Sequence, residues 1–159
     1  MKKNILIFVV LVVLAPFALA DTMMVVVQNY TSSVCQLSSV YASDKESVSY
    51  YPMSPQGIPV FADIFPGQKT PFQLEGVGGE FVEFGYDCYG GVTPGSASLK
   101  AAIPRNEDAG YEAATVVQNH SIQVKKRTFK WALQSNQSLW QVYFDIYDST
   151  DPFYAMLNH

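Results

Sequence analysis

His120 stands directly before Ser121, and these are the two residue types that a serine nucleophile and its general base require. Their surroundings predict a turn, where a solvated histidine is the simpler interpretation. The sequence also lacks the GxSxG, HExxH, phosphate-loop and dinucleotide-binding glycine motifs. It therefore predicts a protein that is not an enzyme.

Acidic side chains gather in two places along the chain. Glu80, Glu83 and Asp87 lie near or on one predicted strand, and carboxylates that face each other across a cleft can hydrolyse a glycosidic bond. On a single strand they are more simply a row that faces solvent. The aspartates of residues 145–151 lack the glycine-punctuated spacing of a calcium loop. We therefore expect no catalytic carboxylate pair, no metal and no cofactor.

Basic side chains are concentrated in one short segment. Within six positions the chain carries Lys125, Lys126, Arg127 and Lys130, and Trp131 follows them. Cations beside aromatic rings suit an anionic or zwitterionic lipid headgroup at a membrane interface. The alternative is an ordinary charged hairpin turn. In either case the segment predicts an exposed basic turn, with Trp131 or a tyrosine at its edge.

The chain has 10 tyrosines, more than a core of this size needs. Alternation places Tyr143 and Tyr147 on the strand face opposite Trp140 and Phe144. Exposed amphipathic rings serve contacts with protein, sugar or a membrane interface equally well. The alternative is that a further layer of the fold covers them.

Residues 1–20 have the three parts of a secretory signal peptide: Lys2 and Lys3, an apolar run, and the small-residue site Ala18-Leu19-Ala20. We therefore expect cleavage before Asp21 and a secreted or periplasmic protein. Cleavage would leave eight basic against 14 acidic side chains. This acidic balance argues against nucleic acid as a partner, because phosphate binding requires a basic field.

The remaining chain predicts an all-β fold, a single antiparallel β-sandwich of about nine short strands over residues 21–159, with an irregular tail from about residue 148. The clearest alternation runs from Phe81 to Cys88 and directs Cys88 inward. In an exported protein, Cys35 and Cys88 predict one disulfide. Pro66-Gly67 has the chemistry of a type II turn. Runs of strand-forming residues begin near residues 23, 35, 48, 57, 72, 81, 99, 114, 122, 129 and 140.

Residues 23–89 resemble the front half of aegerolysin-type proteins, small β-sandwiches similar in shape to actinoporin-like cytolysins. Three features carry the resemblance: the opening strand that ends in Asn29, the turn Phe65-Pro66-Gly67, and the strand segment from Gly79 to Asp87. The resemblance implies a β-sandwich that binds membrane lipid.

These observations predict a secreted, non-enzymatic binding protein that recognises a lipid membrane or a host surface, with a cytolysin component as one form of it. The alternative is a periplasmic or extracellular module that binds protein or glycan without membrane activity. The oligomeric state stays open. The predicted binding residues are Lys125, Lys126, Arg127, Lys130, Trp131, Tyr143 and Tyr147.

Overall fold

A computed structural model describes residues 21–44, 49–52, 63–92, 94–105, 113–132 and 138–150. The expected signal peptide, the short strand expected over residues 57–61 and the tail beyond residue 150 lie outside the described residues. The described part contains nine strands and no α-helix: β1 (Asp21–Asn29), β2 (Val34–Ala42), β3 (Ser49–Pro52), β4 (Lys69–Gly76), β5 (Phe81–Tyr89), β6 (Gly95–Ala102), β7 (Ala114–His120), β8 (Ile122–Ala132) and β9 (Ser138–Asp148).

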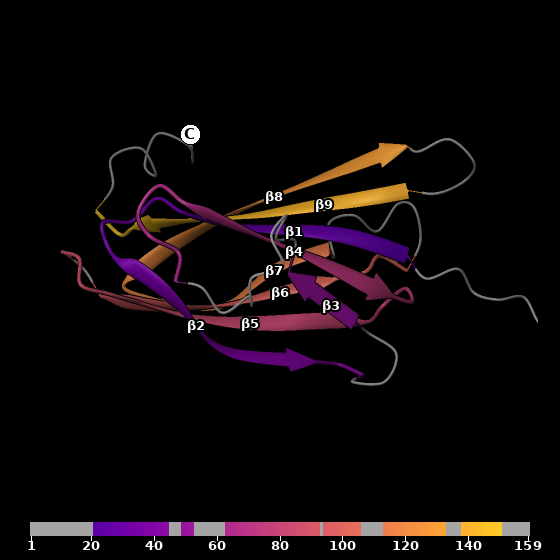
Figure 1. Cartoon of the computed structure of the whole chain (residues 1–159), viewed down its shortest axis with the longest axis horizontal. Coiled ribbons are helices and arrows are strands. Elements are labelled where there is room, and N and C mark those ends of the chain that lie inside the picture. The colour runs from indigo at the N-terminus through magenta and orange to yellow at the C-terminus, as the bar shows by residue number, and fades with distance from the viewer. Residues whose placement is uncertain are drawn as a thin grey trace, which may run out of the picture.

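The strands form two sheets that pack face to face, as the sequence predicts. One sheet has the order β3-β4-β1-β9-β8 and the other the order β2-β5-β6-β7. Figure 1 shows the two layers, with β8 and β9 in one and β2 and β5 in the other. All described pairings are antiparallel except that of β1 with β9, which is parallel. The fold is a β-sandwich.

Alternating apolar residues build the core between the sheets. On β5, Val82, Phe84, Tyr86 and Cys88 are all buried, as their two-residue spacing predicts. The inward residues of β9 meet them from the other sheet. Phe72 of β4 packs on Phe84, with their ring centroids 5.0 Å apart. Burial of these large side chains is the main source of stability in such a sandwich. The inward residues of β9 are Trp140, Val142, Phe144 and Ile146.

The structure confirms the disulfide between Cys35 and Cys88. The two residues stand directly opposite each other on β2 and β5, with their α-carbons 3.9 Å apart. Structural disulfides are typical of proteins in oxidising compartments, which is compatible with an extracellular or periplasmic location. Among the described residues, no helix has the length and apolar character needed to cross a membrane.

The segment Lys125–Lys130 is not a turn, and this expectation from the sequence was wrong. It lies within β8, which pairs with β9 without a break from Ile122 opposite Asp148 to Ala132 opposite Ser138. The long partner strand and the half-buried stems of Lys125 and Arg127 outweigh the low strand preference of charged residues.

Candidate functional site

Strand alternation divides the basic cluster between two faces of the five-stranded sheet. In the register of β8 and β9, Lys125 stands opposite Asp145 and Arg127 stands opposite Tyr143. Both cations therefore lie on the outer face. Lys126 is paired with Phe144 and belongs to the other face. Lys130 also lies on that other face, opposite Trp140. The four cations therefore do not form one patch.

The outer face of β8 and β9 is organised around an ion pair. Arg127 Nε lies 2.7 Å from Asp145 Oδ2, and a second guanidinium nitrogen donates to Asp145 Oδ1 at 2.9 Å. The Asp145 side chain is 3% exposed and that of Arg127 is 39% exposed. The hydrogen bond to Asp145 raises the pKa of Arg127 above its usual range. Arg127 is thus a fixed cation whose charge is largely compensated.

Aromatic rings line the same face. The guanidinium carbon of Arg127 lies 4.8 Å from the ring centroid of Tyr143, and Phe129 meets Tyr143 edge-on. Tyr147 is buried and stacks on Tyr30, with ring centroids 4.9 Å apart and planes inclined by 6°. A shallow cavity of about 210 Å³ lies between these two tyrosines, Lys125 and the ion pair. We call this surface the β8–β9 face.

The remaining predicted residues lie elsewhere. Lys126 Nζ donates a hydrogen bond to the carbonyl of Ala114, the first residue of β7, at 3.0 Å. Lys130 Nζ lies 5.4 Å from the ring centroid of Trp140. The side chain of Trp131 lies outside the described part, although its backbone pairs with Leu139. Of the predicted set, the structure brings together Lys125, Arg127, Tyr143 and Tyr147.

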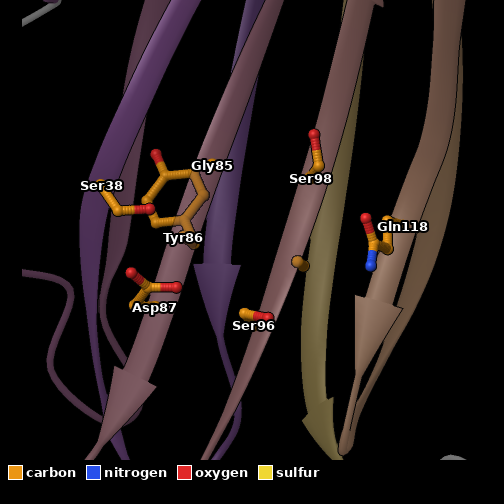
Figure 2. A pocket seen from close by; sticks show the side chains of 8 residues that line it. Ser38, Gly85, Tyr86, Asp87, Ser96, Ser98 and Gln118 are labelled. Carbon is orange, nitrogen blue, oxygen red and sulfur yellow. The ribbon is translucent and has the colours of Figure 1, made fainter.

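A second surface feature, which sequence reasoning missed, is a hollow on the outer face of the four-stranded sheet. It has a volume of about 190 Å³ and lies at Gly85, where β5 carries no side chain. Figure 2 shows the polar groups that surround it, from four neighbouring strands. We call it the serine hollow. Its polar side chains are Ser38 of β2, Asp87 of β5, Ser96 and Ser98 of β6, and Gln118 of β7.

Two local irregularities shape the serine hollow. The register of β2 and β5 shifts between Leu37 and Ser39, and Ser38 lies at this shift. A β-carbon at Gly85 would come within 2.2 Å of Ser39 Oγ, so glycine is required where the strands approach. The sequence signal for this hollow was a glycine inside one strand and serines at alternate positions of the next strand.

Most polar groups of the serine hollow are available for a ligand. Ser98 Oγ donates to Glu83 Oε1 at 2.6 Å. Within the described residues, the side chains of Ser38, Ser96, Asp87 and Gln118 make no hydrogen bond. Hydroxyl, amide and carboxylate groups therefore converge on one depression with their hydrogen-bonding capacity unused.

His120 and Ser121, the residue types that suit a serine nucleophile and its base, lie within hydrogen-bond distance of each other. His120 Nδ1 lies 3.0 Å from Ser121 Oγ, both residues are exposed, and Ser121 occupies a turn with φ of 58°. Glu83 is bonded to Ser98, while Asp87 belongs to the serine hollow. In the described part of the chain, no group of three or more His, Cys, Asp or Glu side chains could hold a metal ion.

Comparison with known proteins adds no assignment. No protein-family model matches the chain. No curated protein matches its sequence.

Proposed function

We propose that the protein is an exported, non-enzymatic binding protein that recognises a glycan on a cell or host surface through the serine hollow. The observation that carries this proposal is the set of uncommitted polar groups around Gly85. Sugars present hydroxyl groups that both donate and accept hydrogen bonds. Serine hydroxyls, a glutamine amide and an aspartate carboxylate complement them.

Exposed rings on the same sheet face supply the apolar part of such a site. Tyr41 lies opposite Glu83 on the neighbouring strand, and Tyr89 follows Asp87 by two positions, so both share the outer face with the serine hollow. Their side chains are 57% and 45% exposed. A tyrosine ring offers a flat surface on which the C–H face of a sugar can lie.

A glycan array with the exported protein, followed by NMR titration of the best ligand, tests the proposal. We expect shift changes at the amides of Gly85, Asp87 and Ser98. The double variant Asp87→Ala/Gln118→Ala should lose most of the affinity, because it removes two of the uncommitted groups. Gln68→Ala, which deletes an exposed amide elsewhere, is the matched control.

Each outcome of this experiment has a different consequence for the proposed glycan site. Binding that the double variant retains, or shift changes confined to the β8–β9 face, would move the glycan site away from the serine hollow. Absence of binding to every glycan on the array would overturn the proposal.

A second candidate function is attachment to a lipid membrane, as the resemblance to cytolysins implies. The observation that favours it is the β8–β9 face, where Lys125 and Arg127 lie beside Phe129, which is 42% exposed. The division of the cluster and the pairing of Arg127 with Asp145 reduce the charge that a flat membrane would meet. Lys125, which is half-buried on the same face, adds its charge to the attraction of anionic lipid.

Co-sedimentation with vesicles of phosphatidylcholine and phosphatidylglycerol tests this candidate. Lys125→Ser should weaken binding by about 1 kcal/mol, or roughly fivefold, and added salt should weaken it further. Lys69→Ser, an exposed cation on another strand, is the control. Equal binding of both variants and the unaltered protein would exclude the β8–β9 face as the attachment surface.

A further inference from the structure

We propose that Lys100, Arg105 and Lys126 form a binding site for a phosphate or sulfate group, separate from the serine hollow and from the β8–β9 face. The three side chains line a cavity of about 580 Å³, together with Gly79 and Thr115. They come from β6, from the segment that follows β6, and from β8. Neither Lys100 nor Arg105 stood out in the sequence, because the three cations are distant from one another along the chain.

The cavity is positive on a molecule that is negative as a whole. The chain has 14 acidic and 10 basic side chains, yet among the described residues three basic and no acidic side chains line this cavity. The nearest acid in register is Glu83, opposite Lys100 on β5. It accepts a hydrogen bond from Ser98 and does not line the cavity. Such a local field attracts anions.

Contacts with the protein hold two of the cations in place. Lys126 Nζ donates to the carbonyl of Ala114 at 3.0 Å, which leaves its two other protons for a ligand. Lys100 Nζ lies 3.7 Å from the ring centroid of Phe81. Because these contacts already hold both ammonium groups, less side-chain conformational entropy is lost when an anion binds.

Arg105 is positioned by a glycine turn. Gly79 has φ of 97°, and a β-carbon there would lie 2.5 Å from Arg105 Nε, so the guanidinium packs against bare backbone. Two backbone hydrogen bonds hold the turn. Gly79 N–H donates to Ile103 at 2.7 Å, and Ile103 N–H donates to Glu80 at 2.8 Å.

The donors specify the chemistry of the ligand. A guanidinium presents parallel N–H groups that match two oxygens of a tetrahedral oxyanion, and two ammonium groups add charge from other directions. The Thr115 hydroxyl lies at the same cavity and supplies a neutral donor. The volume accommodates a phosphate or sulfate ester with part of the group that it is attached to. Free phosphate and a lipid headgroup phosphate share this chemistry.

The test is an NMR titration of the complete exported protein with inorganic phosphate at constant ionic strength, with chloride as the balancing anion. We expect saturable shift changes at the amides of Gly79, Lys100 and Thr115. The variant Lys100→Gln/Arg105→Gln should lose at least tenfold in affinity. Arg105→Lys keeps the positive charge but removes the parallel N–H groups of the guanidinium, and should lose affinity to a smaller extent.

A matched variant and further probes complete the experiment. Lys69→Gln removes an exposed cation from another surface and should leave phosphate binding unchanged. Glycerol phosphate and phosphatidylglycerol vesicles then separate a soluble ester from a lipid headgroup. Non-saturating shifts that chloride reproduces, or unchanged affinity in Lys100→Gln/Arg105→Gln, would overturn the proposal. Neither result bears on glycan binding by the serine hollow.

Discussion

Tyr86 buries a hydroxyl group for which the described residues provide no hydrogen-bond partner. Burial raises the pKa of Tyr86 well above its usual range, because the ionised form would lack solvation. An unpaired buried hydroxyl costs about 1–3 kcal/mol. We therefore expect Tyr86→Phe to leave the midpoint of urea unfolding unchanged or to raise it. A marked fall in the midpoint would show that the hydroxyl has a partner.

The same residue makes stability depend on alkaline pH. Tyr86 holds its proton in the folded state above pH 10, whereas the unfolded chain releases it near pH 10. Its contribution to the free energy of unfolding is therefore complete below about pH 10 and declines as the pH rises further. Melting temperatures from pH 8 to 11 should fall less steeply in Tyr86→Phe than in the unaltered protein. Parallel curves would contradict this linkage.

The ion pair of Arg127 and Asp145 should respond unequally to loss of its two partners. Arg127→Met leaves a carboxylate that is 3% exposed without its cation, which costs about 3 kcal/mol. Asp145→Asn leaves a guanidinium that is 39% exposed and can turn to water, so we expect about 1 kcal/mol. Urea unfolding of both variants measures the two losses. An equal or reversed order would mean that Asp145 is hydrated.

At the scale of single elements, the disulfide between β2 and β5 closes a long stretch of chain. The cysteines are 53 positions apart, and a crosslink of this span stabilises by about 4 kcal/mol in the chain-entropy model. Cys35→Ser/Cys88→Ser should lower the melting temperature by roughly 10–15 °C. Calorimetry with and without reductant measures the same effect in the unaltered protein. A double variant as stable as the oxidised protein would show that the disulfide does not contribute to the stability of the fold.

Local patterns predicted the elements that depend on neighbours in the chain. The turn Phe65-Pro66-Gly67-Gln68 forms as expected, with Gly67 at φ of 79° and Gln68 N–H donating to the Phe65 carbonyl. Alternation also predicted the inward face of β5 and the shared face of Tyr143 and Tyr147. Lys125 and Arg127 join those tyrosines because β8 is a strand.

Features that depend on pairing between distant strands could not be predicted. The serine hollow requires Gly85, Ser98 and Gln118 to be neighbours, which follows only from the order β5-β6-β7 and its register. The positive cavity requires Lys126 of β8 to lie beside the outer face of the other sheet. A period of two residues reveals which way a side chain points, but not what stands beside it.

At the scale of the whole molecule, the expected export has a direct test. If residues 1–20 are cleaved after Ala20, as the sequence predicts, the exported protein should begin at Asp21. Its intact mass should also be two hydrogens lower than that of the reduced chain, because the bridge is formed. A product that retains residues 1–20 would contradict the expected location.

The parallel pairing of β1 with β9 also decides when folding can finish. β9 lies between β1 and the edge strand β8, although more than 100 residues separate it from β1 in the chain. A growing chain that ends before Ser138 has a gap where the sheet should be continuous, and no local segment can fill it. This topology therefore delays completion of the five-stranded sheet until almost all of the chain has been synthesised.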